Sequence, residues 1–223
     1  MRHILIGGTG RAGTTLLVQV FTALGFDTGF TLDEAKSRID PISQAGLEVN
    51  LRKGKRHHVM KAPALADHLA AMLADEGFEV EAAIVPMRDL FAAAESRRSV
   101  YDKAQNAGKD ALAHPGSLWK TDNPAEQEAQ LALQFYRFVQ PLVANDVPLY
   151  LIDFPRFVGD GPYLYRALLP LMETHGVSEA RLVEALAAVA RPDAVHDFKT
   201  GSAGQAKAPT GKPGVIDRLF GKR

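Results

Sequence analysis

The chain of 223 residues contains no cysteine and has no net charge at neutral pH. Without cysteine there can be no disulfide bonds, thiolate nucleophiles or cysteine-ligated metal ions, and this absence is typical of a reducing compartment. We therefore expect a cytoplasmic protein. The 26 basic residues balance the 26 acidic ones, so no overall field indicates nucleic acid or an anionic membrane as a partner. Any attraction for an anionic ligand has to be local.

Long apolar runs are also missing. The first apolar stretch ends at Gly7, and no stretch approaches the roughly 18 residues of a membrane span. We expect neither a signal peptide nor a membrane span. From residue 199 the composition shifts to glycine, lysine, alanine and proline, with no core pattern until residue 215. The sequence therefore predicts one domain over residues 1–198 and a flexible basic tail over residues 199–223.

A glycine-rich turn follows the first apolar stretch, since residues 4–15 read ILIGGTGRAGTT. Glycines let successive backbone amides face one centre, and the next helix adds its unpaired amides and its dipole, which together form a phosphate site. The spacing Gly8-x4-Gly13-Thr14-Thr15 is that of a Walker A loop, except that Thr14 replaces the lysine. Because that lysine neutralises charge in phosphoryl transfer, its absence argues against ordinary ATP or GTP chemistry. A tight turn that binds no ligand is the structural alternative.

Strand and helix patterns alternate along the chain and predict a doubly wound α/β fold with a mostly parallel sheet and helices on both faces. The expected strands after the first are residues 58–61, 80–86 and 147–154. The expected helices are residues 14–25, 64–76, 89–106, 125–145, 163–174 and 178–190. Residues 27–50 show no clean period and are expected to be an irregular segment near the glycine loop. In such folds ligands bind beyond the carboxyl ends of the strands, where this loop lies.

A second motif lies at the end of the third expected strand, where Arg88 is followed eight residues later by Ser96. Together with the lysine-less loop, which carries Arg11 before Gly-Thr-Thr, this pair resembles the nucleotide-binding apparatus of P-loop sulfotransferases, especially their compact bacterial and tyrosylprotein-type members. The resemblance covers about residues 1–100, and the C-terminal Arg-Lys-Gly segment of that family is not evident. It implies a P-loop NTPase-like fold and 3′-phosphoadenosine 5′-phosphosulfate (PAPS) as co-substrate.

The resemblance also implies two anion sites on this nucleotide. The loop would hold the 5′-phosphosulfate, and Arg88 with Ser96 would hold the 3′-phosphate. The nucleotide-binding residues that it implies are Gly8, Thr9, Gly10, Arg11, Ala12, Gly13, Thr14, Thr15, Arg88 and Ser96.

Three catalytic residues follow from the same resemblance. Arg11 would neutralise charge on the leaving phosphate, and Lys61, in a Lys-Ala-Pro segment, partly matches a Lys-Asp-Pro-like motif whose lysine reaches the transferring group. Glu48 resembles the carboxylate base of a Gly-Tyr-Trp-Glu-like segment, because an attacking hydroxyl must lose its proton to a base. His57 and His58 are alternatives for that base. No metal site is expected, because the spacing of the histidines indicates none.

The sequence thus predicts transfer of a sulfuryl group from PAPS to a hydroxyl or amine. Two alternatives stay open: a divergent P-loop kinase or NTPase, in which the strand ending at Asp153 resembles a Walker B strand, and a non-catalytic nucleotide-binding protein. The acceptor is open among saccharide, lipid, peptide and small metabolite, and so is the oligomeric state.

Overall fold

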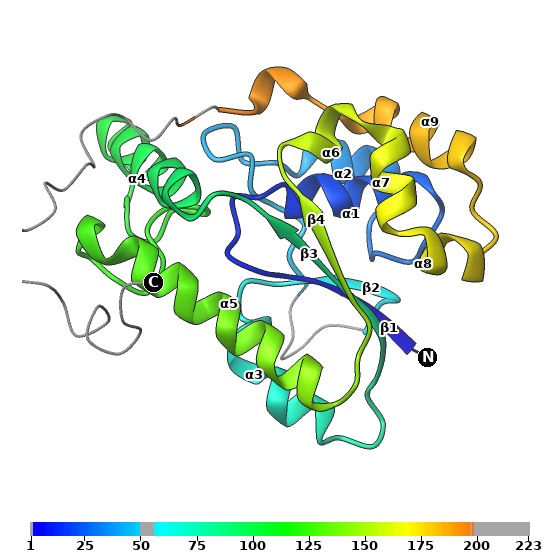
Figure 1. The fold of residues 1–223 in the computed structure, drawn as a ribbon. Coiled ribbons are helices and arrows are strands. Elements are labelled where there is room, and N and C mark those ends of the chain that lie inside the picture. Colours follow the sequence, from blue (N-terminus) through cyan, green and yellow to red (C-terminus); the bar gives the residue numbers. More distant parts are fainter. Residues whose placement is uncertain (1, 50–55, 197, 199–223) are drawn as a thin grey trace, which may run out of the picture.

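Four parallel strands form the central sheet of the computed structural model, which describes residues 2–49, 56–196 and 198 (Figure 1). The strands are β1 (Arg2–Ile6), β2 (Val59–Lys61), β3 (Glu79–Met87) and β4 (Leu149–Asp153), in the order β2-β1-β3-β4. Their near-continuous apolar sequences suit a sheet that is covered on both faces. The predicted α/β class with a parallel sheet is confirmed, and the arrangement is compatible with a doubly wound fold.

Helices cover both faces of the sheet (Figure 1). Ile4 and Ile6 of β1 point into a core shared with α1 (Thr14–Ala23), α7 (Gly161–Ala167) and α9 (Glu179–Val189). Leu5 points the opposite way, into a core shared with α3 (Leu65–Leu73) and α5 (Gln127–Ala144). Side chains alternate between the faces of a strand, so β1 contributes to both cores and is completely buried from Ile4 to Ile6.

Two predicted segments differ from the structure. Residues 27–50 were expected to be irregular, but they contain α2 (Leu32–Ser37) and an isolated bridge between Ile39 and Gly46. A capping box starts α2: the Thr31 hydroxyl accepts from the Glu34 amide, and the Glu34 carboxylate accepts from the Thr31 amide. The expected helix over residues 163–174 is divided, because α7 ends before α8 (Leu169–Thr174), and α6 (Arg156–Gly159) precedes both.

The carboxyl ends of three strands bring together segments that are distant in the sequence. The glycine loop follows β1, Lys61 is the last residue of β2, and Arg88 follows β3. Asp89 then caps α4 (Leu90–Asn106) by accepting a hydrogen bond of 2.8 Å from the Ala92 amide. This one edge of the sheet therefore carries most of the residues that the sequence singled out.

Short 3-10 turns at Pro124–Glu126 (η1) and Pro192–Ala194 (η2) complete the described elements. None of the helices in the described ranges combines the length and the apolar character needed to cross a membrane. The predicted tail, residues 199–223, lies outside the described residues.

Close packing at the end of β1 predicts a large effect of a single methyl group. A Cβ added to Gly7 would lie 2.4 Å from Cζ of Phe138, whose ring belongs to α5 and is fully buried. We expect Gly7→Ala to lower the free energy of unfolding by about 1–3 kcal/mol, measured by urea denaturation. Gly159→Ala is the control, because no atom lies within 4 Å of the added Cβ. Equal stability of the two variants would contradict this packing.

Candidate functional site

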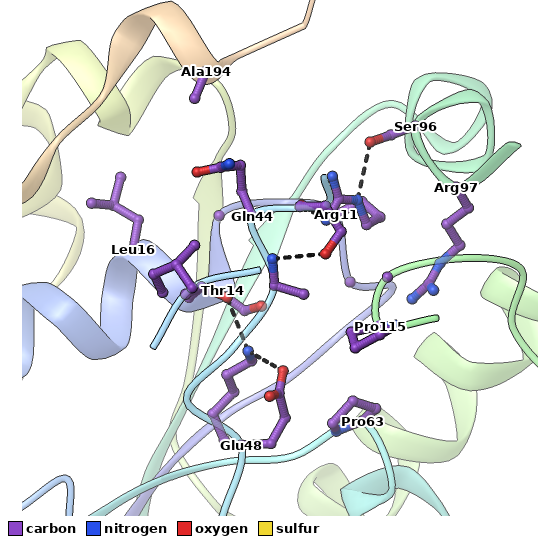
Figure 2. A pocket seen from close by; sticks show the side chains of 18 of the residues that line it. Arg11, Thr14, Leu16, Gln44, Glu48, Pro63, Ser96, Arg97, Pro115 and Ala194 are labelled. Atoms are coloured by element: carbon purple, nitrogen blue, oxygen red, sulfur yellow. Dashed lines mark hydrogen bonds and ion pairs between the residues drawn. The ribbon is translucent and has the colours of Figure 1, made fainter. Parts of the chain in front are cut away.

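A cavity of about 600 Å³, here called the main cavity, opens at the carboxyl edge of the sheet (Figure 2). Its wall includes the glycine loop with the start of α1, parts of residues 39–48 and 188–196, and the loop of residues 112–119. A volume of this size is typical of sites for small molecules and cofactors.

The glycine loop, part of which lines this cavity, has amides without a protein partner. Gly13 caps α1 with a φ of 79°, a left-handed conformation that favours glycine, and no side chain caps the helix. Within the described residues, the amides of residues 9–15 donate no hydrogen bond to another protein group. These donors are left to solvent or to a ligand, and the positive end of the helix dipole favours an anion there.

Arg11 is the centre of the site's polar contacts (Figure 2). Its Nε donates to Ser96 Oγ at 3.0 Å, and its Nη1 donates to the carbonyl oxygen of Ser43. The carbonyl oxygen of Arg11 accepts from Nη1 of Arg88 at 2.8 Å. Burial and then the charge of Arg88 lower the pKa of Arg11 to about 10, and the charge of Asp40 opposes this. Arg88 and Ser96 are thus both hydrogen-bonded to Arg11 of the glycine loop.

The sequence predicts one anion site at the loop and another at Arg88 and Ser96, whereas in the structure these residues share one cavity. Arg11, Arg88 and Ser96 all line the main cavity, and the Arg11 side chain links the loop to Ser96. The Arg88 guanidinium also donates to the carbonyl oxygen of His196 and lies 5.1 Å from the Phe154 ring centroid. A single continuous cavity therefore contains all three residues.

Lys61 and Glu48 form a second polar group in the same cavity. Nζ of Lys61 donates to Glu48 Oε1 at 2.7 Å, to the carbonyl oxygen of Gly46 at 2.6 Å and to Thr15 Oγ1 at 3.0 Å. The Lys61 side chain is only 7% exposed, whereas that of Glu48 is 36% exposed. Burial lowers the pKa of Lys61, although the charge and hydrogen bond of Glu48 act in the opposite direction. An ammonium and a carboxylate are thus held beside the start of α1.

The two histidines proposed as alternative bases lie elsewhere. His57 Nδ1 is 2.8 Å from Asp27 Oδ1, and His58 Nε2 is 3.3 Å from Glu81 Oε2. Neither histidine lines the main cavity. Of the three candidates for the base, Glu48 is the one that does.

The residues of the glycine loop divide into two groups. Gly10, Arg11, Gly13, Thr14 and Thr15 line the main cavity. The other three predicted loop residues do not: Gly8 borders a second, much smaller cavity, Thr9 is buried, and Ala12 packs in the core beside α1. The structure therefore does not bring these three residues to the wall of the main cavity.

Arg97 is a cavity residue that the sequence analysis did not single out. Its guanidinium donates to the carbonyl oxygens of Ser117 at 2.7 Å and Thr9 at 3.3 Å, while its Nε has no partner. Burial and then the charge of Arg11 lower the pKa of Arg97 to about 9. A sequence signal existed, because Arg97 lies on the helix face shared by Ala93 and Val100. An arginine on an apolar helix face is a buried cation that needs an explanation.

Positive charge dominates the wall of the main cavity. Glu48 is its one carboxylate among the described lining residues. The cationic lining residues are Arg11, Lys36, Lys61, Arg88, Arg97 and Arg191. Because buried charges are costly without a counter-charge, this excess favours an anionic ligand.

No family model, curated protein or solved structure matches the chain. The interpretation of the site therefore rests on its geometry and its charge.

The segment that holds Arg11 predicts a dependence of stability on pH. Asp40 Oδ1 accepts from the Ser43 amide at 2.7 Å, the Ser43 hydroxyl at 2.8 Å and His114 Nε2 at 3.1 Å. Burial raises the pKa of Asp40, but these hydrogen bonds outweigh it, so the pKa is lowered from 3.8. A carboxylate with a lowered pKa stabilises the fold above its unfolded-state pKa, and this contribution is lost as pH falls through the folded-state pKa.

We therefore expect Asp40→Asn to lower the free energy of unfolding at pH 7 by about 1–3 kcal/mol. The difference from the original protein should shrink below pH ~4, where Asp40 itself becomes protonated. Urea denaturation over a pH series measures this, with the exposed Asp102 changed to Asn as the control. A difference that stays constant down to the acid limit would rule out ionised Asp40 as its source.

Proposed function

We propose that this protein is a sulfotransferase with a P-loop NTPase-like fold, which moves a sulfuryl group from PAPS to a hydroxyl or amine acceptor. One observation carries the proposal: a glycine loop with unpaired amides, Arg11, Arg88 and Ser96 line a single cavity with an excess of positive charge. A doubly phosphorylated nucleotide supplies the negative charge that this wall lacks.

The residues present suit this nucleotide in three ways. The loop amides and the start of α1 would hold the 5′-phosphosulfate, as helix N-termini do for anions. Arg88, which donates to the backbone carbonyl oxygen of Arg11, and Ser96, which accepts from the Arg11 guanidinium, would hold the 3′-phosphate. The buried Nε of Arg97 has no partner in the described structure, and a bound anion at this wall would offset the charge of its guanidinium.

PAPS would supply an activated sulfuryl group on a phosphate leaving group. Glu48 would take the proton of the acceptor hydroxyl as its oxygen forms the new bond to sulfur. Arg11, Lys61 and the loop amides would stabilise the 5′-phosphate, which keeps the electron pair of the broken sulfur–oxygen bond. Lys61 donates to both the Glu48 carboxylate and the Thr15 hydroxyl. It would therefore lie between the proposed base and the proposed site of the 5′-phosphate.

The geometry favours this proposal over a kinase or NTPase. The carboxylate expected to hold Mg²⁺ in such enzymes is that of Asp153, at the end of β4. Asp153 is exposed and does not line the main cavity. Thr14 provides no cation at the position of the P-loop lysine, and the cations of this cavity stand at other positions, Arg11 of the same loop among them.

Nucleotide binding provides the first test. We expect calorimetry to show binding of 3′-phosphoadenosine 5′-phosphate without Mg²⁺, and Arg88→Ala to weaken it roughly ten- to hundredfold, the usual effect of losing a charged hydrogen bond. Arg137→Ala is the matched control, because Arg137 is exposed on α5 and does not line the cavity. Tight binding of ATP-Mg²⁺ without response to the bisphosphate would instead support a kinase or NTPase.

The catalytic role of Glu48 is tested separately from binding. We expect Glu48→Gln to lower the rate of sulfuryl transfer about 10²–10⁴-fold, the usual contribution of a general base. Its affinity for 3′-phosphoadenosine 5′-phosphate should change little, because the loop, Arg88 and Ser96 remain. The rate is measured as nucleotide release from PAPS over a panel of saccharide, lipid, peptide and small-metabolite acceptors, with Glu34→Gln on α2 as the control. Binding without turnover by the original protein on the whole panel would favour a non-catalytic nucleotide-binding protein.

A further inference from the structure

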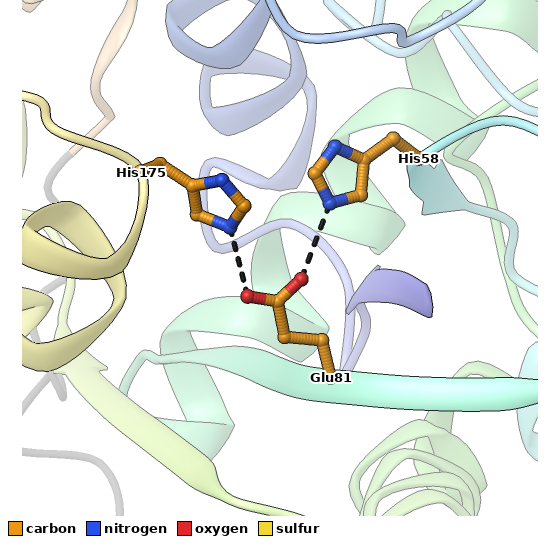
Figure 3. A group of neighbouring side chains, drawn as sticks. All are labelled: His58, Glu81 and His175. Carbon is orange, nitrogen blue, oxygen red and sulfur yellow. Dashed lines mark hydrogen bonds and ion pairs between the residues drawn. The ribbon is translucent and has the colours of Figure 1, made fainter. Parts of the chain in front are cut away.

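A group of three potential metal ligands lies outside the main cavity (Figure 3). The imidazoles of His58 and His175 both point their Nε2 atoms at the carboxylate of Glu81, at 3.3 Å and 2.8 Å. The ligand atoms of all three residues lie within 4.8 Å of one another. The spacing of the histidines in the sequence predicts no metal site, but the fold brings two of them to one carboxylate.

The three residues come from separate segments that the fold fixes. His58 directly precedes β2, and its carbonyl oxygen accepts a hydrogen bond of 2.7 Å from the Ile4 amide of β1. His175 follows α8. Glu81 lies in the amino-terminal half of β3, which is the half of the strand far from the glycine loop.

A β-bulge orients Glu81. The pairing of β1 with β3 passes from His3–Val80 to Ile4–Ala82, so Glu81 has no partner in β1. Val80 packs with the core of α3 and α5, whereas Ala82 packs with the core of α1 and α9, and the alternation of faces is broken between them. Bulges of this kind redirect a side chain and are frequent beside functional sites.

In the described part of the chain, no lysine or arginine forms an ion pair with Glu81. Its side chain is only 10% exposed, and within the described residues its ion pairs are to His58 and His175 alone. Buried carboxylates are usually paired with a cation or coordinate a metal.

From this geometry we infer that His58, Glu81 and His175 form a divalent transition-metal site of the Zn²⁺ type. Imidazole nitrogens with one carboxylate suit zinc and its neighbours, whereas Mg²⁺ and Ca²⁺ prefer all-oxygen sites. Two ligands about 2.1 Å from one ion at a tetrahedral angle lie roughly 3.4 Å apart, so small side-chain rotations would complete the geometry. The histidine side chains are 22% and 23% exposed, which leaves a path for the ion and a fourth position for water.

Binding of the ion would join the start of β2, the strand β3 and the turn between α8 and α9. The ring of Phe26 packs against both imidazoles, with centroid distances of 5.4 Å to His58 and 5.0 Å to His175, and limits how far they can turn away. A ligand that binds the folded protein alone stabilises it, so we expect the melting temperature to rise with Zn²⁺ concentration. This site shares no residue with the main cavity and is independent of the proposed sulfuryl transfer.

The test uses the full chain, free of any affinity tag and treated with a chelator. Titration with Zn²⁺ in a calorimeter should show one equivalent bound with a micromolar or lower dissociation constant. Glu81→Gln and His175→Gln should each weaken binding by at least the ~10–100-fold that follows the loss of an outer-shell partner. His68→Gln, at an exposed position on α3, should leave binding unchanged. Circular dichroism checks that each variant is folded.

A second measurement needs no variant. Zn²⁺ should shift the imidazole NMR signals of His58 and His175, and Co²⁺ in its place should give the visible absorption of a low-symmetry site. The inference is overturned if the original protein binds no Zn²⁺ at micromolar concentrations, which would leave a hydrogen-bonded cluster alone. It is also overturned if the binding persists in the two variants or the shifted signals belong to other histidines.

Discussion

The excess of buried positive charge around the glycine loop is the constraint on which the site depends. Arg97 is buried and Arg11 is partly buried. Burial and then the charge of Arg88 lower the pKa of Arg11, and burial and then the charge of Arg11 lower the pKa of Arg97. Carbonyl oxygens of Thr9, Ser43 and Ser117 solvate these cations in place of carboxylates. Neutral acceptors compensate only part of the cost of burying a charge, so the arrangement favours a state in which an anion completes it.

The segments around Arg11 are held by hydrogen bonds and close contacts of their own. Asp40 organises the turn that carries Ser43, and the carbonyl oxygen of Ser43 accepts from Arg11. The capping box at Thr31 begins α2 and fixes the approach of the chain to this turn. On the other side, Gly116 lies so close that an added Cβ would be 3.1 Å from Nη1 of Arg11. The Arg11 guanidinium therefore contacts the segments on both sides of it, the turn at Ser43 and the loop at Gly116, and helps to position them.

The elements of the sheet could be predicted well from the sequence, because strands buried on both faces leave continuous apolar runs such as residues 80–86. The convergence of Arg88 and Ser96 on the loop could also be expected, since both follow a parallel strand whose end adjoins that of β1. The position of His57 and His58 outside the main cavity could not be predicted. It depends on their pairing with Asp27 and Glu81, which are distant in the sequence. Periodicity reports which face of an element is apolar, and it does not report which polar groups from other elements meet there.

The two ends of the sheet differ in the kind of charge that they bury. At the carboxyl end, the described lining of the main cavity has six cationic side chains and one carboxylate, which favours an anion. Near the amino-terminal end of β3 a single carboxylate is held by two imidazoles, which favours a cation. Strand β3 belongs to both sites, because it contains Glu81 in its first half and leads directly into Arg88. A parallel sheet separates such sites by the length of a strand, so opposite charges can be buried around one sheet without neutralising each other in the folded state.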